Sequence, residues 1–267
     1  MISNLYCMLG YSYLRADEIK KSFYYFKKEF KICSKSSTRF QSCCNNLGTL
    51  YFKLKQYDKA IYYLEQASNS VYGITAAHTY FSLGFAYYRT NQLEKGQKFL
   101  EKSLEIFLTM DNTCAMLSQY ILGRICRHLK LYDKALEYHE KALDIKIKVL
   151  KDNLINFNEC NPDILYSFGF LYYDIGITLQ KKGEYEKSIY YHEKGLSIFC
   201  KTFYMYDEYI DHVDLYKSLG IAYEKIGNKS KAIENYENTI FEFHAIFGAN
   251  HKKTLSAIAK LKRIQES

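Results

Sequence analysis

The sequence has almost no proline and no tryptophan, since Pro162 is the only proline among 267 residues. Proline breaks helices more strongly than any other residue, so its scarcity favours a chain built from helices. No run of 18 apolar residues could form a transmembrane helix, and the N-terminus lacks the basic and apolar segments of a secretory signal. These absences predict an all-α protein without a membrane partner. We expect it in the cytosol or the nucleus, and we take the cytoplasm as its location.

Motifs for metal binding and catalysis are also missing. The eight cysteines form no Cys-x-x-Cys pair and no Cys/His group with zinc spacing. Cys43 and Cys44 are adjacent, and we expect them to be reduced packing residues, because no cation lies close enough in sequence to lower their pKa. The chain contains no G-x-S-x-G, Walker, G-x-G-x-x-G or H-E-x-x-H motif. The sequence therefore predicts a protein that is not an enzyme and has neither a cofactor nor a metal site.

Basic residues outnumber acidic ones, 37 to 29, which gives a net charge of +8. This excess mildly favours acidic partners. It is spread along the chain without runs of five like charges, so RNA binding is the weaker interpretation.

What the sequence does contain is a unit that repeats six times around a Leu-Gly or Ile-Gly pair. The glycines are Gly10, Gly48, Gly84, Gly123, Gly176 and Gly220. Twelve positions after each glycine stands a small residue: Ser22, Ala60, Gly96, Ala135, Ser188 and Ala232. Sixteen positions after it stands a large one: Phe26, Leu64, Leu100, His139, His192 and Tyr236. Glycine inside a helix costs about 1 kcal/mol relative to alanine, so we expect each glycine to let a second helix approach closely. Helix pairs of this kind stack into a solenoid, because no single pair can bury its own apolar face.

Two segments, "NNLGTLYFKLKQYDKAIYYLEQA" (45–67) and "LGIAYEKIGNKSKAIENYENTI" (219–240), carry the pattern most clearly. They resemble the tetratricopeptide repeat, with its aromatic–Leu–Gly–Tyr first helix and Ala–Phe/Tyr–Ala second helix. The length of the repeats resembles the kinesin light chain subtype, and 158–167 and 247–258 are similar to its linkers. The resemblance implies an all-α, right-handed α-solenoid of about six helix pairs with a C-terminal capping helix.

Under this resemblance we expect a single solenoid domain over residues 1–267. Its repeats would span about 3–38, 41–74, 77–112, 116–155, 169–207 and 213–247, and the capping helix 252–265. The polar segment 151–163 predicts an enlarged surface loop, with a lengthened helix before it. The first helix begins at about Ser3 without a preceding cap, which suggests a piece of a longer protein.

Two histidines stand at matched positions, His139 in "YDKALEYHEKALDI" and His192 in "YEKSIYYHEKGLSI". A metal site on one helix needs a second ligand three or four residues away, and neither histidine has one. Both occupy the position that holds a large packing residue in the other repeats. We therefore expect them to pack between helices.

In the tetratricopeptide family the first helices line a concave face. Core residues four before, one before and three after each glycine leave the positions three before, one after and four after it to face that groove. The candidate peptide-binding residues are Asn45, Thr49, Phe52, Phe81, Phe85, Tyr88, Tyr120, Arg124, Arg127, Tyr173 and Ile177. Aromatic and arginine side chains are typical interface anchors. The alternative is that aromatics are simply abundant here, at 17%. A further basic column, five residues after each glycine and including Arg89, is assigned to the helix dipole.

The sequence thus predicts a non-catalytic scaffold that captures a protein or peptide segment in a concave groove. The basic charge of the chain favours acidic residues in that segment. Phe81, Phe85, Tyr88 and Tyr120 would be apolar anchors, and Arg124 and Arg127 would pair with carboxylates. Three alternatives stay open: a peptide-sensing regulator resembling the Rap proteins, the repeat part of a larger signalling protein, and an RNA-binding helical repeat.

Overall fold

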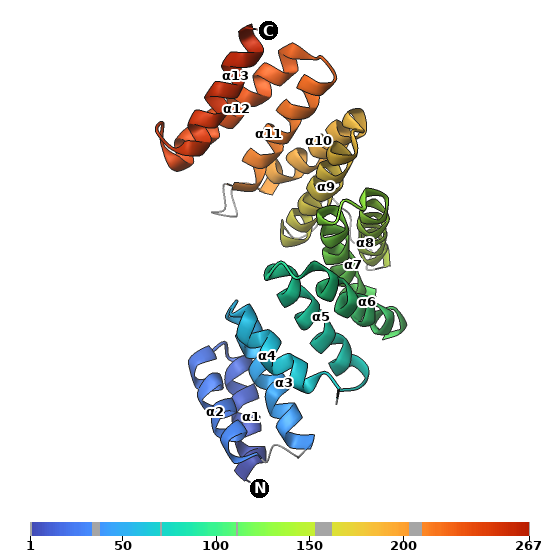
Figure 1. Cartoon of the computed structure of the whole chain (residues 1–267), viewed down its shortest axis with the longest axis vertical. Coiled ribbons are helices and arrows are strands. Elements are labelled where there is room, and N and C mark those ends of the chain that lie inside the picture. Colours follow the sequence, from blue (N-terminus) through green and yellow to red (C-terminus); the bar gives the residue numbers. More distant parts are fainter. Residues whose placement is uncertain are drawn as a thin grey trace. The chain divides into compact units, whose positions relative to one another are not determined.

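Every regular element in the described residues is an α-helix (Figure 1). The computed structural model describes residues 2–33, 38–69, 71–110, 112–152, 162–202 and 210–266. These helices divide into two compact units, Met1–Leu129 and Lys130–Ser267. No helix within the described ranges combines the length and the hydropathy needed to cross a membrane. The all-α prediction is confirmed.

The first unit stacks helices in the order of the sequence. They are α1 (Ile2–Arg15), α2 (Ile19–Ile32), α3 (Thr38–Lys53), α4 (Tyr57–Ala67), α5 (Gly73–Arg89), α6 (Leu93–Met110) and α7 (Asn112–His128). Each helix packs on the next, and α5 also contacts both α3 and α7. The first helices of successive repeats therefore form one continuous layer within this unit.

The second unit continues the same pattern. It contains α8 (Tyr132–Asp152), α9 (Pro162–Lys182), α10 (Tyr185–Thr202), α11 (Ile210–Lys225), α12 (Lys229–Phe247) and α13 (Lys252–Glu266). The 21 residues of α8 confirm the lengthened helix, and α13 packs on α12 at the place expected for the capping helix. Helix α9 begins at Pro162, upstream of residue 169, because proline suits the first position of a helix. Residues 153–161 of the expected surface loop lie outside the described part of the chain.

Each first helix ends in a turn of one kind. Seven positions after the repeat glycine, the backbone is left-handed in all six repeats, with φ between 57° and 94° at Asp17, Lys55, Asn91, Lys130, Gly183 and Gly227. In the second repeat, Lys55 N donates to Phe52 O and Gln56 N to Tyr51 O, which is the Schellman pattern. This turn reverses the chain so that the second helix packs back along the first.

The close approach predicted at the repeat glycines is present. A Cβ atom on Gly48 would lie 2.5 Å from Cγ of Leu64, and one on Gly176 would lie 2.5 Å from the His192 ring. The small residue of the second helix completes the contact, since the Ser188 hydroxyl donates to Gly176 O at 2.9 Å. The repeat glycines are thus packing positions, as the sequence predicted.

Candidate functional site

The structure places all eleven predicted groove residues at half-buried positions of first helices. They lie on α3 (Asn45, Thr49, Phe52), α5 (Phe81, Phe85, Tyr88), α7 (Tyr120, Arg124, Arg127) and α9 (Tyr173, Ile177). Nine of them therefore belong to the first unit and two to the second. Partial burial at every one of these positions is typical of side chains that line a face rather than fill a core.

An aromatic strip runs across the first helices of the first unit; it consists of Phe52, Phe81, Phe85, Tyr88 and Tyr120. The Phe52 and Phe85 rings meet edge to face, with centroids 5.4 Å apart. Phe85 also lies 6.2 Å from both Phe81 and Tyr88. Ring pairs at these distances stabilise one another, so the strip is a preorganised apolar surface.

Arginine side chains lie over this strip. The Arg124 guanidinium is 5.7 Å from the Tyr88 ring and 5.8 Å from the Tyr120 ring. Arg89 lies 5.9 Å from Phe85 and 5.0 Å from Tyr57. Cation–π contacts of this kind hold a guanidinium against an apolar surface, where it can meet a carboxylate.

Tyr57 and Arg89 were not among the predicted groove residues. Arg89 stands in the basic column that the sequence assigned to the helix dipole, and Tyr57 begins a second helix. An (i, i+4) pairing of Arg89 with Phe85 on one helix face is the sequence signal that could have identified the arginine.

Asn45 is partly engaged within the fold. Its Oδ1 accepts a hydrogen bond of 2.7 Å from the Thr79 hydroxyl, which links α3 to α5. Its Nδ2 donates to no residue in the described ranges. The amide can therefore still donate to a bound backbone, as predicted, but it has one acceptor fewer to offer.

The two histidines are packing residues, as the sequence predicted. His139 and His192 are both fully buried. Burial lowers the pKa of His192 to about 3, so its imidazole is neutral at physiological pH. The neighbouring Glu193 does not face His192 but accepts a hydrogen bond of 2.6 Å from the Tyr223 hydroxyl. The thiol of Cys44 also has a raised pKa because of burial, in agreement with a packing role.

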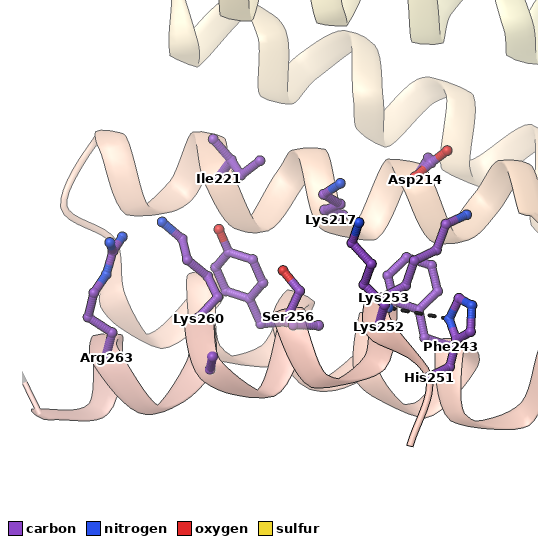
Figure 2. Close-up of a pocket in the computed structure, with 13 residues that line it drawn as sticks. Asp214, Lys217, Ile221, Phe243, His251, Lys252, Lys253, Ser256, Lys260 and Arg263 are labelled. Atoms are coloured by element: carbon purple, nitrogen blue, oxygen red, sulfur yellow. Dashed lines mark hydrogen bonds between the residues drawn. The ribbon is translucent and has the colours of Figure 1, made fainter. Parts of the chain in front are cut away.

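The second unit contains a pocket of about 810 Å³ between α11, α12 and α13 (Figure 2). Five of its thirteen lining residues are lysine or arginine. The lining consists of Asp214, Lys217, Ile221, Tyr236, Phe243, His251, Lys252, Lys253, Ser256, Ala257, Ala259, Lys260 and Arg263. Sequence reasoning missed this pocket, because α13 was assigned only a capping role.

The charges of this basic pocket are unevenly compensated. Glu224 pairs with Lys260 at 2.8 Å and with Arg263 at 3.2 Å. Lys217 and Lys252 form no ion pair with any described residue, and Asp214 is the only acidic side chain in the lining. The pocket is thus able to accept an anionic group.

Comparison with known proteins agrees with this architecture. The family model described as "Tetratricopeptide repeat" matches residues 40–109 and 74–148. The TPR repeat-containing protein MJ1428 of Methanocaldococcus jannaschii is 25% identical over 227 residues, which cover 82% of this chain and 33% of that protein. The chain therefore spans about a third of the length of this relative.

Two solved structures are similar in fold. A Signal Transduction ATPase with Numerous Domains from Pyrococcus horikoshii, which has a tetratricopeptide repeat sensor, superposes with a TM-score of 0.69 at 17% identity, over 97% of this chain and 38% of that one. A putative kinesin light chain of Podosopora anserina with nearly identical TPR-like repeats gives 0.57 at 19% identity, over 79% and 97%.

Stacked helix pairs with glycine contacts and left-handed turns define a helical-repeat protein of the solenoid class. Within that class, residues 40–148 match the tetratricopeptide repeat family. The kinesin light chain subtype stays a prediction, because a likeness at 19% identity shows the fold alone.

Proposed function

We propose that this chain is a non-catalytic scaffold that captures a segment of a partner protein along the first helices of its repeats. The observation that carries the proposal is the aromatic strip of the first unit, with Arg89 and Arg124 lying over its rings. Phe81, Phe85, Tyr88 and Tyr120 act as apolar anchors in this proposal, and Arg124 and Arg127 bind carboxylates.

An acidic partner segment is supported by both units. Arginines accompany the strip in the first unit, and the basic pocket of the second unit contains the uncompensated Lys217 and Lys252. A segment with carboxylates near apolar side chains matches this combination, because a guanidinium held on an aromatic ring can bind a carboxylate while the ring buries an apolar neighbour. We also propose a cytoplasmic location, which fits the free thiols of the described residues.

The test compares the wild type with a Phe85→Ala/Arg124→Glu double variant in affinity purification from the native cell extract. We expect the wild type to retain a partner and the variant to lose it, with affinity reduced about 30-fold or more, since two hot-spot residues are removed. Circular dichroism establishes that both proteins are folded.

The matched control is Tyr62→Ala/Lys59→Glu, which removes one ring and reverses one charge on the second helix α4. Tyr62 is 61% exposed and lies outside the strip, so this variant should bind as the wild type does. Equal binding by the Phe85→Ala/Arg124→Glu variant would move the site away from the strip. A steep loss of affinity with salt, together with RNA in the purified complex, would favour nucleic-acid binding instead.

A second candidate is the repeat part of a ligand-responsive regulator. It is favoured by the superposition of 97% of this chain on part of the Pyrococcus horikoshii protein, which has a tetratricopeptide repeat sensor. A regulator would change the spacing of its repeats when ligand binds, whereas a rigid scaffold would not. Small-angle X-ray scattering of the chain with and without the purified partner distinguishes the two.

A further inference from the structure

Two cysteines and a glutamate from α2 and α3 meet near the start of the chain. The Sγ atoms of Cys33 and Cys43 are 3.1 Å apart, and they lie with a carboxylate oxygen of Glu29 inside a group whose atoms are all within 4.8 Å of one another. Cys43 is fully buried, Glu29 is 2% exposed, and Cys33 is partly exposed. The group is therefore internal, with one side open to solvent at Cys33.

Glu29 is an exception within its own column. The position 19 residues after the repeat glycine is buried in every repeat, and elsewhere it holds a small side chain: Ala67, Ser103, Ala142, Gly195 and Thr239. A carboxylate in a core position is costly unless it is compensated. Packing alone gives no reason for glutamate here.

The surrounding chain compensates this carboxylate only in part, through the side chains of Cys43, Cys7 and Asn46 and the charge of Arg39, and burial outweighs them. Glu29 Oε2 accepts no hydrogen bond from the described residues, and Glu29 forms no ion pair with them. The nearby amide of Asn46 is shared with other groups, since its Oδ1 accepts from the Tyr11 hydroxyl at 2.6 Å and its Nδ2 also donates to Cys7 Sγ at 3.7 Å. A cation at the group would supply the missing partner.

We propose that Glu29, Cys33 and Cys43 form a binding site for a thiophilic divalent cation, Zn²⁺. Thiolate and carboxylate ligands suit Zn²⁺, which binds sulfur at about 2.3 Å and oxygen at about 2.0–2.2 Å in a tetrahedral arrangement. Three protein ligands leave a fourth position for water on the open side at Cys33. The bound ion links the last turn of α2 to α3, and so ties the first repeat to the second.

The experiment uses the full chain, reduced and stripped of metal, with Zn²⁺ titrated against a chromophoric chelator. We expect one Zn²⁺ per chain. Cys43→Ser and Glu29→Gln should each weaken Zn²⁺ binding about 100-fold. Loss of a residue that only hydrogen-bonds to a metal ligand weakens metal binding about 10- to 100-fold, and loss of a ligand itself should cost at least as much. Co²⁺ as a second probe should give thiolate charge-transfer absorption in the wild type and lose it in Cys33→Ser/Cys43→Ser.

Glu29→Gln separates metal binding from folding. It keeps the side-chain shape and removes a charge that is compensated only in part, so without metal it should be at least as stable as the wild type, while Zn²⁺ should raise the melting temperature of the wild type only. Cys200→Ser, which removes an exposed thiol on α10, should bind like the wild type. The proposal is overturned if Glu29→Gln or Cys43→Ser binds Zn²⁺ as tightly as the wild type, or if the reduced wild type binds no Zn²⁺.

Discussion

The two units are built from the same helix-pair repeat, but they carry different side chains at equivalent positions. In the first unit, the first helices carry the aromatic strip with arginines over its rings, and the glycine contacts are made by Phe26, Leu64 and Leu100. In the second unit, α11 carries Lys217, Ile221 and Glu224 at the corresponding positions, and the glycine contacts are made by His192 and Tyr236. The first unit thus offers flat apolar anchors, whereas the second offers an open basic pocket.

This difference shows which positions of the repeat must keep the same kind of residue in both units. The glycine, the small residue twelve positions later and the left-handed turn recur in both units, because each fixes how two backbones approach. Side chains at the groove positions do not set that approach, so they are free to differ. Specificity is expected where the columns vary.

The largest effect should come from the repeat glycines, and it should differ between Gly84 of the first unit and Gly220 of the second. A Cβ on Gly84 would lie 2.9 Å from Gly96 O and 2.9 Å from Leu100 N, both backbone atoms. On Gly220 the nearest atoms, at 3.1 Å, belong to the Tyr236 ring, which can shift. We expect Gly84→Ala to destabilise by about 3 kcal/mol. Gly220→Ala should remain within about 1 kcal/mol of the wild type, because alanine's helix propensity offsets the crowding.

Urea denaturation followed by circular dichroism measures both variants. Equal destabilisation by Gly84→Ala and Gly220→Ala would show that the second unit is as tightly packed at its glycine as the first, and would remove this part of the comparison.

Much of the fold could be predicted, because the same residue pattern recurs six times along the chain. Six glycines with small residues twelve positions later and large ones at sixteen specify the helix pair, and the structure has the predicted contacts at Gly48 and Gly176. The start of α9 at Pro162 lay beyond this reasoning, since it falls in the segment where the period breaks.

The sites were less predictable, because they combine columns from several helices. The groove positions follow from periodicity, but Arg89 and Tyr57 join the strip only through contacts between helices. The group of Glu29, Cys33 and Cys43 has no motif spacing, since its members come from two helices. The basic pocket depends on how α13 packs, which no sequence pattern describes.

The next largest effect on stability is expected at His192. This residue stands sixteen positions after its repeat glycine, where the two units have different side chains. Neither of its ring nitrogens has a hydrogen-bond partner in the described residues, and leucine fills the same slot at Leu64 and Leu100. His192→Leu should therefore stabilise the chain by about 1–2 kcal/mol at pH 7. The benefit should grow on acidification. The pKa of His192 is about 3 in the folded chain against 6.5 unfolded, so the unfolded state binds the extra proton between these values.

As pH falls through that window, the wild type should lose about 1.4 kcal/mol per pH unit relative to His192→Leu. Urea midpoints at pH 7 and pH 5 measure the difference between the two proteins. A pH slope that is the same in His192→Leu and wild type would mean that His192 is not buried in its neutral form.

The smallest effect concerns the capping helix that closes the basic pocket. Glu224 holds α13 through Lys260 and Arg263 and also accepts a hydrogen bond of 3.2 Å from the Tyr236 hydroxyl. Burial by itself raises the pKa of Glu224, but these partners outweigh it and lower the pKa, so the carboxylate is charged at neutral pH.

Glu224→Gln should reduce the free energy of unfolding by about 0.5–1 kcal/mol, as expected for partly exposed ion pairs. Because the loss falls on one docked helix, amide hydrogen exchange in α13 should become about 2- to 5-fold faster while that in α9 stays unchanged. Glu237→Gln, on the exposed face of α12, should change neither helix. If α13 exchanged at the wild-type rate in Glu224→Gln, its docking would rest on apolar contacts such as Phe243 with Ala257, and the basic pocket would keep its shape without the ion pairs.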